Sequence, residues 1–258
     1  LKQNWKLFLG ITALYALLNL LLVQNFFGID VSAAKDSAQS FLHGHWGRVA
    51  SGFSVIGYLF GSAGTSPSTS AYRLMLAIIG SLAMIWALRQ VLAGTARVRI
   101  RDSFYEGMYP LVPFILVFLV ISLQLIPITI ALYLYGTVGA SGLIEAVLWA
   151  LVIGAVAALT LYMLSSSIFA LYVACLPGMT PVASLKAAAN LVRHRRLAVV
   201  SRLIMLPIMF FVLLAVVMIP LIIFATPAVT VVFFLFLMVV LPVIHSYFYS
   251  LYRELLNE

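Results

Sequence analysis

Acidic residues and cysteine are scarce in this chain of 258 residues. Cys175 is the only cysteine, so no disulfide can form within the chain. Charged residues make up only 9% of the sequence, whereas about a quarter of an ordinary soluble domain is charged. A chain of this size needs a polar shell in order to fold in water. The shortage of charge therefore excludes an ordinary water-soluble domain.

Sequence signatures of known catalytic sites are also missing. The chain contains no P-loop, no zinc-protease helix and no nucleophile elbow. The acidic residues Asp102, Glu106 and Glu254 have no partner histidine in the sequence. His43 and His45 lie close together, but two histidines without further ligands are a weak metal signal. We therefore expect no enzymatic activity, no catalytic residue, no cofactor and no metal site.

Long apolar runs are what the sequence has in abundance. Hydrophobic residues make up 64% of the chain, and the mean hydropathy is +1.16. A helix needs about 20 apolar residues to cross a bilayer core, and it satisfies all of its backbone hydrogen bonds internally. We therefore expect an all-α integral membrane protein, with residues 1–258 forming one polytopic domain. The six expected spans are Leu7–Phe27, Tyr72–Ala93, Leu111–Tyr135, Ser141–Leu176, Leu203–Phe224 and Ala228–Tyr249.

Basic residues are distributed unevenly between these spans. Only Lys35, Arg48 and Arg73 fall on one side, and the other twelve of the 15 basic residues fall on the opposite side. Basic residues accumulate in cytoplasmic loops, so we expect both chain ends in the cytoplasm. The net charge of +8 is explained by this bias, and we expect no nucleic-acid partner.

The fourth run and the first long connection depart from a simple bundle. A continuous helix from Ser141 to Leu176 would extend about 54 Å at 1.5 Å per residue. It must tilt strongly or project toward the cytoplasm, and we favour projection. Residues 28–71 form the expected external loop, in which Phe53–Phe60 is an apolar stretch. That stretch is either a re-entrant or interfacial helix or a loop resting on the membrane.

Two basic connections, which we call the first elbow (residues 95–109) and the second elbow (residues 177–202), lie on the expected cytoplasmic side. In the first elbow, arginine alternates with other residues from Arg97 to Arg101, a period of two that indicates extended chain. Ser103 and Glu106 then match a capping box. The sequence therefore predicts a helix that begins at Phe104.

The second elbow begins with Thr180 as the expected N-cap and Pro181 at the first helical position. At 3.6 residues per turn, the following helix separates a polar arc from an apolar arc. We expect this amphipathic helix to lie in the membrane surface. The polar arc contains Lys186, Asn190, Arg193 and His194, and the apolar arc contains Val182, Leu185, Ala188, Ala189 and Val192.

Both elbows are candidate contact surfaces for anionic lipid or for an acidic surface of a protein partner. Each basic residue close to an anionic leaflet contributes on the order of 1 kcal/mol. The alternative is that the elbows only set the topology and anchor the bundle. The candidate contact residues are Arg97, Arg99, Arg101, Lys186, Arg193, Arg195 and Arg196.

The stretch Leu161–Val200 carries a family resemblance. It combines a long span, a proline break and an amphipathic helix leading into the next span, with matching residues Pro177, Ala183, Ser184, Leu185, Ala188, Leu191, Val192 and Arg193. This resembles YciC-like six-helix bacterial membrane proteins and the membrane domain of some glycerophosphodiester phosphodiesterases, over about the last two thirds of the chain. The resemblance implies six helices in a bacterial cytoplasmic membrane. It transfers no catalytic residue, because these families have no settled activity for the membrane part.

Three functions remain open at this point. The favoured one is a non-enzymatic membrane-organising protein, either a scaffold or an accessory subunit, whose partners are membrane lipids and a protein or a second copy of the chain. The alternative is a transporter or lipid-handling permease, with a cavity lined by polar residues of the spans. A lipid-modifying enzyme would need a polar cluster that the sequence does not provide. The polar residues available for a transport cavity are Gln124, Glu145, Ser165, Ser166 and Ser167.

Overall fold

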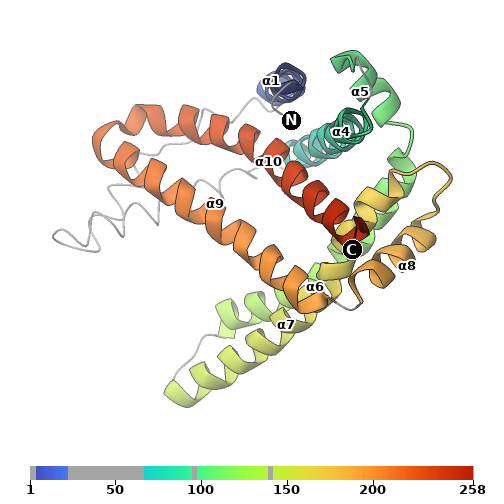
Figure 1. Ribbon diagram of the computed structural model, residues 1–258. Coiled ribbons are helices and arrows are strands. Elements are labelled where there is room, and N and C mark those ends of the chain that lie inside the picture. The colour runs from blue at the N-terminus through green and yellow to red at the C-terminus, as the bar shows by residue number, and fades with distance from the viewer. Residues whose placement is uncertain (1–3, 23–66, 95–97, 139–141, 194, 258) are drawn as a thin grey trace. The chain divides into compact units, whose positions relative to one another are not determined.

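The computed structural model describes residues 4–22, 67–94, 98–138, 142–193 and 195–257. All regular secondary structure in these ranges is helical, which confirms the all-α class. The helices are drawn in Figure 1. They are α1 (Trp5–Leu22), α4 (Pro67–Leu92), α5 (Ile100–Gly107), α6 (Leu111–Val138), α7 (Leu143–Ala174), α8 (Pro181–Val192), α9 (Arg196–Phe224), the short 3₁₀ helix η2 (Thr226–Ala228) and α10 (Val229–Asn257).

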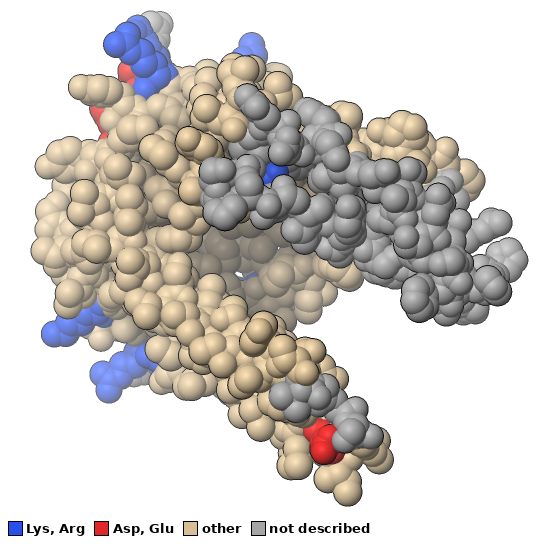
Figure 2. Space-filling model, turned by 180° about the vertical axis from the view of Figure 1, so that it is seen from behind, with Lys and Arg blue, Asp and Glu red and all other residues tan. Residues whose placement is uncertain are grey.

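Six of these helices are long and apolar enough to cross a membrane, namely α1, α4, α6, α7, α9 and α10. Each of them overlaps one of the six expected spans. The described part of the face in Figure 2 accordingly carries few charged side chains. Lipid is the solvent that makes so much exposed apolar surface stable.

Two predicted boundaries are wrong. Helix α9 begins at Arg196 rather than at Leu203, so the last seven residues of the second elbow belong to a membrane-length helix. The predicted span was limited to apolar residues and therefore left out the arginines before Leu203. Arginine is a good helix former, so the helix itself extends through them. Helix α4 begins at Pro67, so residues 67–71 of the predicted external loop are helical. The expected features Phe53–Phe60, His43 and His45 lie outside the described residues.

The overlong fourth span is confirmed as one continuous helix. Helix α7 contains 32 residues, which corresponds to about 48 Å at 1.5 Å per residue. Its buried residues lie in its second half, from Thr160 to Ala174. The helix ends before Pro177, and Gly178 has a positive φ of 75° that lets the chain turn. Projection of α7 beyond the membrane stays a prediction.

The chain divides into two compact units, which are described separately. Unit 1 combines Leu1–Met108 with Leu206–Tyr247, and unit 2 combines Tyr109–Met205 with Phe248–Glu258. Helices α9 and α10 contribute to both units. The expectation of one polytopic domain stays a prediction.

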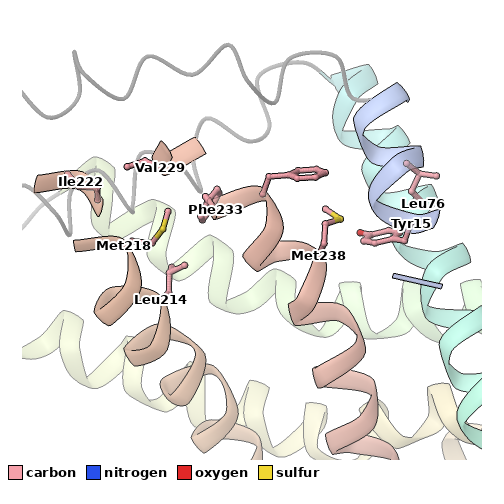
Figure 3. Packing of buried hydrophobic residues seen from close by; sticks show 9 residues of the cluster. Tyr15, Leu76, Leu214, Met218, Ile222, Val229, Phe233 and Met238 are labelled. Carbon is pink, nitrogen blue, oxygen red and sulfur yellow. The ribbon is translucent and has the colours of Figure 1, made fainter. Parts of the chain in front are cut away.

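The core of unit 1 is an apolar cluster at the turn between α9 and α10 (Figure 3). Met218 and Ile222 of α9 are fully buried, as are Val229 and Phe233 of α10. Tyr15 of α1 joins the same cluster. Burial of these large side chains fixes the helical hairpin around a turn that holds no charged residue.

Helix α5 packs against α4 through its smallest side chains. Ser103 and Gly107 are both buried, and a Cβ atom added to Gly107 would lie 3.2 Å from the Cα atom of Ala83. The two helix backbones therefore approach closely, as small residues allow in membrane helices.

This packing corrects the predicted start of the first elbow helix. Helix α5 begins at Ile100, and its N-cap, Arg99, makes no side-chain cap hydrogen bond. The hydroxyl group of Ser103 donates to the carbonyl oxygen of Arg99 at 3.1 Å, so Ser103 is inside the helix and the predicted capping box does not form. The extended chain reaches only Arg99, since Arg101 is helical. The buried face toward α4 requires helix at Ser103, and this outweighs the local signal.

Helix α8 packs against α7 within unit 2. The predicted cap is confirmed, because the hydroxyl oxygen of Thr180 accepts from the N–H of Ala183 at 3.3 Å and Pro181 begins the helix. The buried residues are Ser184, Ala188 and Val192.

The buried face of α8 differs from the predicted apolar arc. Val182, which belongs to that arc, is 75% exposed, whereas Ser184 is fully buried. The helix turns its small side chains toward α7 because they permit close contact. Its larger apolar side chain at Val182 is left on the outer surface.

Candidate lipid-contact surface at the second elbow

The start of α9 and the end of α8 form the most basic part of unit 2. Residues 177–202 contain no acidic residue. Lys186, Arg193 and Arg195 are exposed, and Arg196 is half-buried. We call Lys186, Arg193, Arg195, Arg196 and Arg202 the basic surface. Arg193 and Arg195 lie in the short connection between α8 and α9, Lys186 lies on α8, and Arg196 and Arg202 lie in the first two turns of α9.

Arg196 is oriented by an aromatic ring of the preceding span. Its guanidinium carbon lies 4.2 Å from the ring centroid of Tyr162 on α7. A cation at this distance over an aromatic face is attracted by the ring quadrupole. Arg196 therefore has a packing role in addition to its charge.

Arg202 joins the start of α9 to the end of α10. Its guanidinium group donates two hydrogen bonds to the carboxylate of Glu254, at 2.6 and 2.8 Å. The two side chains are 44% and 46% exposed. A paired arrangement of this kind fixes the direction of both groups, although a half-exposed ion pair contributes little to stability.

A small cavity lies beside this ion pair. Its volume is about 30 Å³, enough for one or two water-sized groups. The polar lining consists of Arg195, Arg202 and Glu254, and the remaining lining is apolar. Arg195 from the connection before α9, Arg202 of α9 and Glu254 of α10 therefore line the same cavity.

The first elbow has a different charge balance. Arg99 and Arg101 are exposed on unit 1, but Asp102 and Glu106 follow them on the same short helix. Arg97 lies outside the described residues. The described contact residues of the first elbow belong to unit 1 and those of the second elbow to unit 2, so the two sets are described separately.

The predicted intramembrane residues are not gathered in one place. Glu145 is in the first turn of α7, and Ser165 lies twenty residues later on the same helix, about 30 Å away at 1.5 Å per residue. The hydroxyl group of Ser165 donates to the carbonyl oxygen of Tyr162, and those of Ser166 and Ser167 donate to that of Met163. The serines therefore satisfy their own helix, as serine commonly does inside spans.

Gln124 on α6 differs from the serines. Its side-chain oxygen is buried and has no hydrogen-bond partner within the described part of the chain. Among those same residues, no group of three or more His, Cys, Asp and Glu side chains is arranged to hold a metal ion.

Sequence reasoning missed the pairing of Arg202 with Glu254 and the cavity beside it. The two residues are 52 positions apart, so no local pattern connects them. Their positions relative to the turn between α9 and α10 could have indicated the contact. Both lie at similar distances in sequence from the short turn at Thr226–Ala228, and antiparallel helices bring such residues to the same level.

Comparison of the chain with protein-family models, with curated proteins and with solved structures finds no match.

Proposed function

We propose that the chain is a non-enzymatic protein of a bacterial cytoplasmic membrane, with both ends in the cytoplasm, that organises its surroundings as a scaffold or accessory subunit by binding anionic lipid. The basic surface at the second elbow is the contact. The observation that carries this proposal is the absence of any acidic residue from 177–202, beside basic side chains that are exposed. The resemblance to YciC-like membrane proteins agrees with it.

Electrostatics supports lipid as the ligand. Each basic residue near an anionic leaflet contributes on the order of 1 kcal/mol. Within the described part of the chain, the one acidic residue that lines this end of unit 2 is Glu254, which is paired with Arg202. The basic surface therefore keeps a positive excess that attracts phosphate groups.

The test removes charge without removing packing. Lys186→Gln/Arg193→Gln changes two exposed residues of the basic surface, and Arg99→Gln/Arg101→Gln removes the same charge from the first elbow. Each protein is placed in nanodiscs that contain equal amounts of phosphatidylglycerol and phosphatidylcholine, and the lipids retained on release are counted by native mass spectrometry. We expect about a fivefold or larger loss of phosphatidylglycerol for the second-elbow variant only.

Two results would contradict the proposal. Equal phosphatidylglycerol retention in both variants and the unchanged protein would mean that the charges only set topology. Loss of a co-purified protein, or of a second copy of the chain, with lipid retention unchanged would assign the basic surface to a protein partner.

A transporter or lipid-handling permease is the second candidate function, and Gln124 is the observation that favours it. A buried amide oxygen without a hydrogen-bond partner costs free energy, and a bound polar molecule would remove that cost. Pro127, inside the same helix, removes a further backbone donor. Mass spectrometry of the protein purified in native lipid tests this function. One small molecule enriched on the unchanged protein and absent from Gln124→Leu would support it, and no such molecule would contradict it.

A further inference from the structure

The side of α8 that is turned away from α7 carries two cations with an amide between them. Asn190 follows Lys186 by four positions and precedes Arg193 by three, so the three residues lie on one side of the helix. All three side chains are exposed. Arg193 is the C-cap of α8 and keeps helical backbone angles, with φ −49° and ψ −43°. We call Lys186, Asn190 and Arg193 the outer row.

The packing of α8 fixes the direction of the outer row. The buried residues of α8 are those on the side that contacts α7. At 3.6 residues per turn, the outer row lies roughly 170° around the helix axis from the centre of these buried residues. The Thr180 cap and Pro181 hold the first turn in place. The outer row therefore faces away from the packed side of the helix.

We propose that the outer row binds the headgroup of one cardiolipin molecule, a lipid in which a single glycerol joins two phosphates. Lys186 and Arg193 each hold one phosphate, and the amide of Asn190 holds the hydroxyl group on the central carbon of the joining glycerol. The inference rests on the proposed function, which places α8 among the lipid headgroups. It deepens that function by naming the lipid that the second elbow selects.

The order of groups along the helix matches the order of groups along this headgroup. Lys186 and Arg193 are seven positions apart, which corresponds to about 10.5 Å along the helix axis. Two phosphates on one glycerol lie closer together than this, but lysine and arginine have long side chains whose charged ends can incline toward each other. A guanidinium group contacts a phosphate through two parallel hydrogen bonds, and an ammonium group acts as a compact positive charge.

Asn190 supplies the group that recognises a hydroxyl rather than a further phosphate. Its amide has an oxygen that accepts and an NH₂ group that donates, and a hydroxyl group can pair with either. A phosphate diester has no proton to donate to the amide oxygen. In addition, the second phosphate of cardiolipin is tethered to the first, so it binds at a high effective concentration. The outer row therefore distinguishes cardiolipin from two separate phospholipids.

Exposed apolar side chains near the outer row favour a lipid as the ligand. Val182 lies one turn before Lys186 on the same side of α8 and is 75% exposed. Leu197, in the first turn of α9, is 87% exposed. Apolar side chains beside exposed cations are typical of a helix that lies in the headgroup region. They offer a contact to acyl chains, which a soluble acidic partner does not have.

The first experiment needs no substitution. The protein is placed in phosphatidylcholine nanodiscs that contain cardiolipin, deoxycardiolipin (the central hydroxyl group replaced by hydrogen) or phosphatidylglycerol at the same phosphate content, and retained lipid is counted by native mass spectrometry. We expect one cardiolipin per chain, retained about tenfold more than phosphatidylglycerol and about threefold more than deoxycardiolipin, the size of one hydrogen bond. Equal retention of cardiolipin and either of the other two lipids would overturn the inference.

The second experiment changes the amide. Asn190→Ala should lower cardiolipin retention to the deoxycardiolipin level and leave deoxycardiolipin retention unchanged, because only the hydrogen bond to the hydroxyl group is removed. Asn190→Ser, which keeps a hydrogen-bonding group, should keep part of the preference. Ser201→Ala is the matched control, since it removes an exposed hydroxyl group from the same elbow outside the outer row. A preference that persists in Asn190→Ala, or an equal loss in Ser201→Ala, would contradict the inference.

The third experiment removes one cation at a time. Lys186→Gln and Arg193→Gln each leave one phosphate contact, so each should lower cardiolipin retention per phosphate to the level of phosphatidylglycerol. Arg99→Gln, which removes an exposed charge from the first elbow, is the control and should keep the preference. A preference that is unchanged in both single variants would overturn the inference. The proposed function fails by a different result, namely unchanged phosphatidylglycerol retention when Lys186 and Arg193 are replaced together.

A last arm separates the lipid from a soluble bisphosphate. Deacylated cardiolipin, which has both phosphates and the central hydroxyl group but no acyl chains, is added to the lipid-depleted protein in detergent. We expect no binding at concentrations where cardiolipin saturates the outer row, as measured by native mass spectrometry. Equally tight binding of the deacylated compound would assign the outer row to a soluble ligand and would overturn the lipid assignment.

Discussion

The two elbow helices pack in the same way and differ in charge. Helix α5 lies against α4 through Ser103 and Gly107, and α8 lies against α7 through Ser184 and Ala188. In both helices the first of these small residues is a serine whose hydroxyl group donates to the carbonyl oxygen four residues earlier, at 3.1 Å in α5 and 2.9 Å in α8. Small residues four positions apart thus recur at both connections.

The two elbows differ in their balance of basic and acidic residues. Helix α5 carries Asp102 and Glu106 next to its arginine, so its charges largely cancel one another. No acidic residue accompanies the basic surface within the second elbow. Packing is shared by both elbows and stabilises each connection, whereas the excess of basic over acidic residues belongs to the second elbow. It is this excess to which we assign the proposed contact with anionic lipid.

The largest expected effect tests the shared packing. Gly107→Leu would place a side chain where even a Cβ atom lies 3.2 Å from the backbone of Ala83. Since neither helix backbone can move freely, we expect a loss of about 2–3 kcal/mol in stability and a clearly lower melting temperature. Ala188→Leu, at a fully buried position in α8, should have an effect of the same kind. Thermal melting followed by circular dichroism measures both.

Gly154→Leu is the matched control for these overpacking variants. Gly154 is in the middle of α7, and no atom lies within 4 Å of a Cβ added there. Leucine is also the better helix former, so we expect no loss of stability. If Gly107→Leu melted together with Gly154→Leu, the close contact between α5 and α4 would be wrong.

The next prediction concerns a variant in which the first elbow, like the second, has no acidic residue. Asp102→Asn/Glu106→Gln leaves Arg101 of α5 and its N-cap, Arg99, without the acidic residues of the same helix. Each basic residue near an anionic leaflet contributes on the order of 1 kcal/mol, so phosphatidylglycerol retention should rise several-fold in the nanodisc measurement. Glu145→Gln, which removes a carboxylate from the first turn of α7, should leave retention unchanged. No increase in the double variant would mean that charge balance does not distinguish the elbows.

Local patterns predicted the parts of the fold that local physics determines. The six spans follow from apolar length alone, and the cap at Thr180 follows from a hydroxyl group followed by Pro181. The start of α5 was predicted wrongly because the prediction used only the local spacing of Ser103 and Glu106. The packing of Ser103 against α4 outweighs this local signal. The ion pair of Arg202 and Glu254 joins residues that are 52 positions apart, and no local sequence pattern predicts such a contact.

The smallest expected effect compares Ser103 and Thr180, both of which the sequence predicts as helix N-caps. Thr180→Ala removes an acceptor that caps the backbone N–H of Ala183, and loss of such a cap costs about 1 kcal/mol. Ser103→Ala removes only a hydroxyl group that donates to the carbonyl oxygen of Arg99, which also accepts from the backbone N–H of Ser103, so we expect a change close to zero. Melting temperatures of the two variants, measured in one detergent, decide the matter. An equal loss in Ser103→Ala and Thr180→Ala would mean that Ser103 caps its helix and that α5 begins at Phe104. Ser103 would then not be a buried packing residue equivalent to Ser184 of α8.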